Sequence, residues 1–209
     1  MENTNFESDN SVLQLKEEFS RQLVDSYQEH FNIELQIEQI VMNPANPIIN
    51  FHMITTEGLR FCVFFDSSTE DMSVTDNYIQ SVCERQIENY IEFMIKDAFI
   101  KVTFIEDFEP ETAEGILYDE YISKHKVSDV VVKIFATDGT VEESMFETIH
   151  QTLFQNVKVP VTYFLYSYDA ENYQQAVDEL KSNLKLTKYI IDCTKPSSVK
   201  SYRKENGEI

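Results

Sequence analysis

The chain has 209 residues, and its 37 Asp and Glu against 17 Lys and Arg give a formal net charge of −20. With 42% hydrophobic residues, 15 Phe and 11 Tyr, it can form a packed core, so the charge belongs to a folded body and not to a disordered acidic tail. A surface this negative is repelled by free nucleic acid and by anionic membranes and is attracted to basic surfaces. We therefore expect a basic protein partner, no direct nucleic-acid binding and no membrane binding.

The first third of the sequence predicts a helix and then a three-stranded antiparallel meander. Apolar residues recur every three or four positions over residues 11–31, which is the period of an amphipathic helix. Residues 33–41 alternate between apolar and polar side chains, as in a half-exposed strand. Two apolar runs follow, Ile48–Thr55 and Leu59–Asp66, and the short turn between them predicts a hairpin.

The rest of the chain alternates between predicted helices and strands. The clearest helix covers residues 74–97. We expect strands at 99–105, 129–136, 159–167 and 186–192, and helices at 110–125, at 140–156 and after Asp169. Because such alternation favours right-handed crossovers, it predicts a mostly parallel sheet. The predicted class is α/β in the broad sense, a mixed α+β fold.

The predicted elements suggest a division into two parts. Residues 1–97 would hold the first helix, the meander and the long helix, and residues 98–196 the alternating part. One continuous domain is the alternative. Residues 197–209 are polar and are expected to form a frayed tail.

The cysteines and the N-terminal residues point to a reducing, cytoplasmic location. The three cysteines form no C-x-x-C pair, and Cys62 and Cys83 lie in apolar patterns that predict burial. The first ten residues have neither the basic nor the apolar region of a signal peptide, and no apolar run is long enough for a membrane span.

The sequence has only four glycines, and their spacing excludes two nucleotide-binding motifs. A dinucleotide fingerprint needs three closely spaced glycines and a P-loop needs two followed by lysine, and the sequence has neither. It also lacks the G-x-S-x-G nucleophile elbow. We therefore name no cofactor, no metal ligand and no catalytic residue, and we favour a non-enzymatic protein while an enzyme stays open as the alternative.

The order α-β-β-β-α-β resembles the core of restriction-endonuclease-like nucleases, and also that of small secretion chaperones. The nuclease family carries an Asp and then an acidic-x-Lys pair on the hairpin, and these residues hold Mg²⁺. Here the hairpin strand Leu59–Asp66 offers Asp66 alone and no acidic-x-Lys pair. The resemblance therefore implies the topology of about half the chain and not the chemistry.

Two acidic stretches are the candidate partner-binding residues. Glu84, Glu88 and Glu92 recur at four-residue spacing and are expected on the outer face of the long helix. An acidic turn follows, composed of Glu106, Asp107, Phe108, Glu109 and Glu111. We expect a non-enzymatic inhibitor that docks a basic surface, of the immunity-protein or nucleic-acid-groove-blocking type, while a merely solvated surface is the alternative reading.

A second function uses the carboxyl ends of the predicted strands. Open α/β sheets bind ligands there, and Asp138, Asp169 and Lys195 would lie around that crevice. This placement would suit a small metal-dependent enzyme or a nucleotide-binding domain. Asp138 and Asp169 also stand where helix caps and turns favour Asp. The basic segment from Lys181 to Lys204 leaves homo-oligomer formation open.

Overall fold

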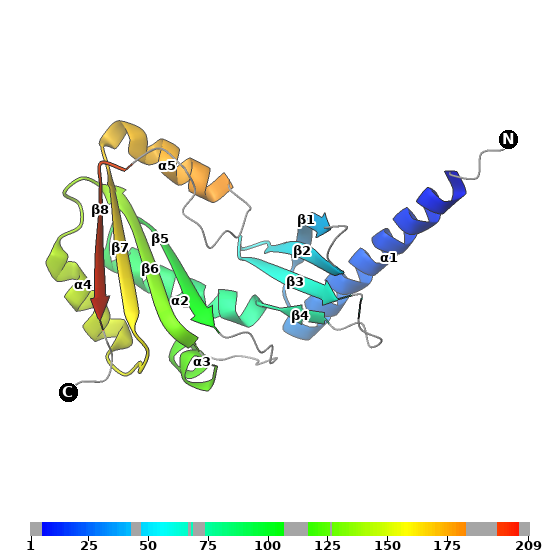
Figure 1. The fold of residues 1–209 in the computed structure, drawn as a ribbon, viewed down its shortest axis with the longest axis horizontal. Coiled ribbons are helices and arrows are strands. Elements are labelled where there is room, and N and C mark those ends of the chain that lie inside the picture. The colour runs from blue at the N-terminus through cyan, green and yellow to red at the C-terminus, as the bar shows by residue number, and fades with distance from the viewer. Residues whose placement is uncertain are drawn as a thin grey trace. The chain divides into compact units, whose positions relative to one another are not determined.

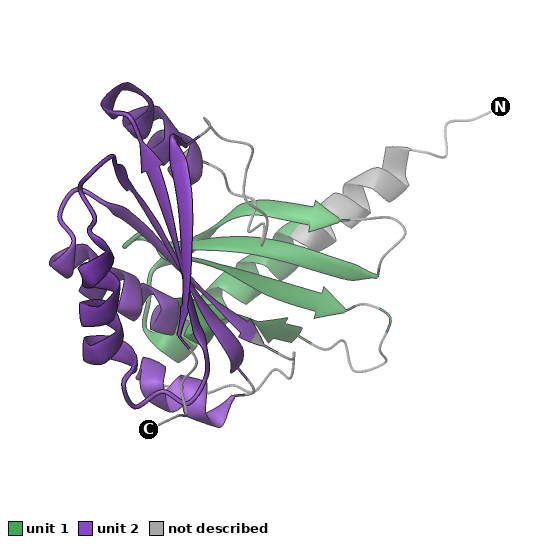
Figure 2. Cartoon of the chain, turned by 60° about the vertical axis from the view of Figure 1, so that its left-hand side comes forward, with its two compact units in different colours: residues 1–81 green, residues 82–209 purple. Residues whose placement is uncertain are grey.

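The computed structural model describes residues 6–42, 47–66, 68, 74–106, 117–125, 127–182 and 196–204. It confirms a mixed α+β fold with two sheets. The chain divides into two compact units, residues 1–81 and 82–209 (Figure 2). This boundary precedes the expected one near residue 98, because most of the long helix belongs with the second unit.

The first unit is a helix packed on an antiparallel meander, as predicted. Helix α1 (Phe6–Phe31) precedes a sheet of order β1-β2-β3-β4. The strands are β1 (Leu35–Met42), β2 (Ile48–Thr55), β3 (Arg60–Asp66) and β4 (Val74–Asp76) (Figure 1). The short strand β4 is an addition, since the helical pattern assigned its residues to the long helix.

Aromatic side chains join α1 to one face of this sheet. The Phe19 ring lies 5.6 Å from that of Phe51 and 4.9 Å from that of Phe65, and Tyr27 lies 5.6 Å from Phe61. The Tyr27 hydroxyl donates a 2.5 Å hydrogen bond to Asp76 Oδ2, which ties α1 to β4. The apolar face of α1, whose residues recur every three or four positions, therefore packs on the face of the sheet formed by every second residue of the strands.

The second unit holds a mixed sheet of order β5-β6-β7-β8. Its elements are α2 (Tyr78–Met94, which begins in the first unit), β5 (Phe99–Glu106), α3 (Tyr118–Lys124), β6 (Val127–Thr137), α4 (Glu143–Ile149), the π-helix η1 (His150–Phe154), β7 (Val161–Tyr168), α5 (Ala170–Ser182) and β8 (Ser198–Lys204). Strands β6 and β7 pair in parallel, whereas β5–β6 and β7–β8 are antiparallel.

The parallel share is lower than expected, because β5 pairs antiparallel with β6 and β8 pairs antiparallel with β7. The α4–η1 segment connects the parallel strands β6 and β7.

Strand β8 corrects the expectation of a frayed tail. Residues 198–204 pair with β7 in antiparallel register, from Ser167 opposite Ser198 to Val161 opposite Lys204. The expected strand at 186–192 lies outside the described residues. A polar edge strand lacks the apolar alternation by which strands are recognised in a sequence.

Both faces of the second sheet are packed. Tyr163 on β7 contacts Phe146 of α4 and Phe154 of η1. Tyr166, three residues later and so on the opposite face, clusters with Phe135 and with Ala176 of α5. Among the described residues, no helix is long and apolar enough to cross a membrane.

Candidate binding surfaces

Glu84 and Glu88 do not form an outer acidic stripe; the structure buries both, at 8% and 4% exposure. Glu84 Oε1 accepts a 2.8 Å hydrogen bond from the backbone N–H of Phe104, and Glu88 Oε1 accepts one of 3.0 Å from Val102. The expectation of a solvated outer face was therefore wrong for these two residues. The four-residue spacing correctly places Glu84 and Glu88 on one face of α2, but it does not show that β5 covers that face.

Two cations compensate the buried Glu88 carboxylate. Lys101 Nζ lies 2.9 Å from Oε1, and Arg85 Nη1 lies 3.1 Å from Oε2. Desolvation lowers the pKa of Lys101, but the Glu88 and Glu84 carboxylates together raise it by more, so its net shift is upward and the ammonium stays charged. A buried carboxylate that accepts hydrogen bonds from a backbone N–H and two cations belongs to the internal structure of the unit.

The remaining predicted docking residues divide between partly exposed and undescribed ones. Glu92 is partly exposed and lies 3.3 Å from Arg85 Nη1. Glu106 ends β5. Asp107, Phe108, Glu109 and Glu111 lie outside the described residues. Their role in partner binding stays a prediction.

The two described members of the alternative crevice occupy a helix cap and a turn. Asp169 Oδ1 accepts hydrogen bonds from the backbone N–H groups of Glu171 (3.1 Å) and Asn172 (2.9 Å), as an N-cap of α5 does. These bonds lower the pKa of Asp169, those with Asn172 most. Asp138 is exposed in the turn after β6. Lys195 lies outside the described residues, which contain no cluster of metal-ligating side chains.

A cysteine–histidine contact is present that sequence reasoning did not identify. His52 and Cys62 are paired across β2 and β3, and Cys62 Sγ lies 3.3 Å from His52 Nδ1. Burial raises the pKa of the Cys62 thiol to about 12, and burial also lowers the pKa of His52 against the opposing effect of Glu38. Both groups therefore favour their neutral forms, unlike an activated thiolate–imidazolium pair. The burial of Cys62 and Cys83 was predicted and is confirmed.

The first unit concentrates negative charge. Residues 1–81 contain 14 Asp and Glu but only three bases, Lys16, Arg21 and Arg60. Arg60 is already paired with Glu38, through bonds of 2.8 and 2.9 Å. Exposed carboxylates occur on α1 and on the loops, at Glu17, Glu18, Asp25, Glu29, Glu34 and Glu57.

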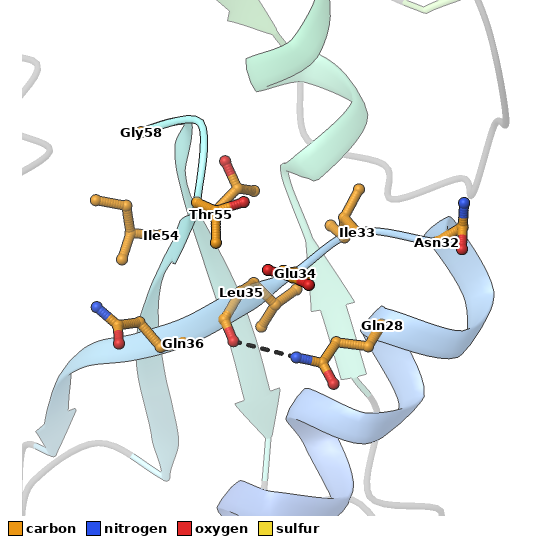
Figure 3. Close-up of a pocket in the computed structure, with 10 residues that line it drawn as sticks. Gln28, Asn32, Ile33, Glu34, Leu35, Gln36, Ile54, Thr55 and Gly58 are labelled. Atoms are coloured by element: carbon orange, nitrogen blue, oxygen red, sulfur yellow. Dashed lines mark hydrogen bonds between the residues drawn. The ribbon is translucent and has the colours of Figure 1, made fainter.

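A hollow of about 860 Å³ lies in this unit, between the end of α1, the start of β1 and the β2–β3 turn (Figure 3). The Gln28 amide of α1 donates a 3.4 Å hydrogen bond to the Leu35 carbonyl oxygen of β1. Glu34 and Gln36 also line the hollow, and both are exposed. The tight turn on the other side needs a positive φ, which Gly58 supplies at 82°. The hollow thus offers one carboxylate and several amide and hydroxyl groups, with no nucleophile–base pair.

Comparison with known proteins shows a shared fold alone. No protein-family model and no curated protein matches the sequence. A solved structure of a DUF5037 family protein from Ruminococcus gnavus ATCC 29149 is similar, with a TM-score of 0.53 and 15% sequence identity. The similarity covers 78% of this chain and 80% of that one.

Proposed function

We propose that this chain is a non-enzymatic binding protein that docks a basic partner through the acidic surface of residues 1–81. The observation that carries the proposal is the charge of this unit, which contains 14 acidic residues and three basic ones. Inhibitors that cover a toxin or a nucleic-acid-binding groove use the same attraction.

The geometry of α1 supports this placement. Glu18, Asp25 and Glu29 are exposed on the helix, while Leu23 and Tyr27 are buried against the sheet. Since the helix is anchored on its apolar side, its carboxylates are presented on a fixed scaffold. Fixed charges of one sign raise the rate of association with an oppositely charged partner.

A random-peptide display library selected on the full chain would test the proposal. We expect the selected peptides to be rich in Lys and Arg, and their affinity to fall as salt is added. Neutralising the α1 carboxylates, in the variant E17Q/E18Q/D25N/E29Q, should weaken peptide binding by about tenfold, mainly through slower association.

The matched control removes four exposed carboxylates from the second unit, in the variant D119N/E142Q/E171Q/D178N. It changes the net charge equally and should keep most of the affinity. Selected peptides without excess basic residues, or affinities indifferent to salt, would overturn the proposal. Equal losses in the two variants would contradict its placement on α1.

A further inference from the structure

The four edge strands of the two sheets differ in how their outer sides are protected. Strand β4 has only three residues. The outer side of β5 is covered where its Val102 and Phe104 N–H groups bond to α2 carboxylates. Strand β8 carries basic residues at Lys200, Arg203 and Lys204. Shortness, coverage and charge are the usual devices that prevent an edge from pairing with another chain.

Within the described part of the first unit, none of these devices protects the second half of strand β1. It is eight residues long, contains no Lys, Arg or Pro, and ends in Ile40, Val41 and Met42, whose exposures are 39%, 38% and 48%. Its one charged side chain, Glu38, is bonded at both oxygens to Arg60. The described strands pair with β1 on its β2 side only.

Helix α1 is hydrogen-bonded to the start of this edge. The Gln28 amide bonds to the Leu35 carbonyl oxygen, at the hollow. A register irregularity between Ile37 and Gln39 follows, and regular pairing with β2 resumes from Gln39 to Met42. Because a bulge changes the direction of the edge, an added strand would pair with the four residues after it.

We propose that an extended basic segment of the partner adds as a strand to the open edge of β1. This inference rests on the proposed function and states where and how the partner binds. Backbone hydrogen bonds would supply affinity, and apolar side chains of the segment would cover Ile40, Val41 and Met42. Where the segment continues past the bulge towards the start of β1, its Lys or Arg side chains would meet the exposed carboxylate of Glu34 at the hollow.

Charge selects this occupant over a second copy of the chain. Two copies would bring together two units that each hold 14 acidic and three basic residues. A segment that alternates apolar with Lys or Arg residues presents the opposite charge. It also has the two-residue period of a strand.

The sharpest test uses one selected basic peptide made with N-methyl groups on alternate amides. Methylation removes a strand donor without changing charge. We expect methylation of one alternate set to abolish binding and methylation of the other set to leave it nearly unchanged. Bound peptide should also slow hydrogen exchange at Gln39–Met42.

A matched pair of variants tests the location. Val41→Lys on β1 and Val199→Lys on β8 each add one positive charge to an exposed valine of an edge strand. We expect V41K to weaken peptide binding about tenfold and V199K less than about twofold.

The outcomes separate this inference from the proposed function. Salt-sensitive binding of basic peptides that is indifferent to the methylation pattern would overturn strand addition while the proposed function stands. Absence of basic peptides among the binders would overturn both. A concentration-dependent dimer that V41K abolishes would assign the edge to a second copy and contradict the inference.

Discussion

At the scale of single residues, Glu84 and Glu88 are the buried carboxylates among the described residues. Glu84 and Glu88 of α2 reach the backbone of β5, where each accepts a peptide N–H. The N–H groups of an edge strand that are covered by a helix have lost water and need another acceptor. The two glutamates therefore close an edge that would otherwise be costly to bury.

Glu88→Ala should lower the free energy of unfolding by about 1–3 kcal/mol, since it leaves the buried Val102 N–H without its acceptor. Urea denaturation measures this loss. The control, Glu92→Ala, removes a more exposed carboxylate from the same helix and should cost less than about 1 kcal/mol. Equal losses would contradict the assigned role of Glu88.

Because the pKa of the buried Cys62 thiol is raised, we expect the protein to lose stability at high pH. Burial raises the pKa of the thiol from 9.0 to about 12 in the folded state, so above pH 9 the unfolded chain releases a proton that the folded chain keeps. The unfolded state then binds fewer protons, and stability falls as the pH rises from 9 towards 12. The free energy of unfolding, measured by urea denaturation at several pH values in this range, should fall more steeply with pH for the natural chain than for Cys62→Ala.

At the scale of elements, the N-terminus of α5 shows how a local signal can have two readings. Asp169 follows a buried strand, which is where a crevice ligand or a helix cap would stand. The structure gives it two backbone N–H donors and the Asn172 side-chain amide. These contacts are those of an N-cap.

Asp169→Ala should destabilise the protein by about 0.5–2 kcal/mol, the usual value of a lost cap. Asp169→Asn should remain close to the natural stability, because an asparagine oxygen caps nearly as well. Thermal melts of the two variants measure the difference. A large loss in D169N would show that the charge has a role beyond capping.

At the scale of the whole molecule, net charge opposes folding. The first unit concentrates like charges, so its compact state contains repulsion that salt can screen. Raising the ionic strength from about 0.01 M to about 0.15 M shortens the Debye length from about 30 Å to about 8 Å.

The melting temperature should therefore rise over this range of salt. The rise should be smaller in E17Q/E18Q/D25N/E29Q, which carries less repulsion on α1. A melting temperature that falls with salt would show that favourable ion pairs, such as Arg60–Glu38, outweigh the repulsion.

Local patterns were sufficient for most elements of the fold. The limits of β2 at Ile48 and Thr55 follow from an apolar run bounded by turn residues, and β1 follows from strict alternation. The candidate site was harder to predict. Glu84 and Glu88 have the spacing of a solvated stripe, and their burial depends on β5, which follows them in the chain. The contact between His52 and Cys62 likewise depends on strand register.

The sequence alone determined the charge, the mixed α+β class and the helix–meander order, because composition and short periods are local properties of a chain. Tertiary structure decided which of the described carboxylates remain in water, that β8 is a strand, and that the described strands pair with β1 on one side only. These are relations between segments far apart in the sequence. They depend on which element covers which, and no local period contains that information.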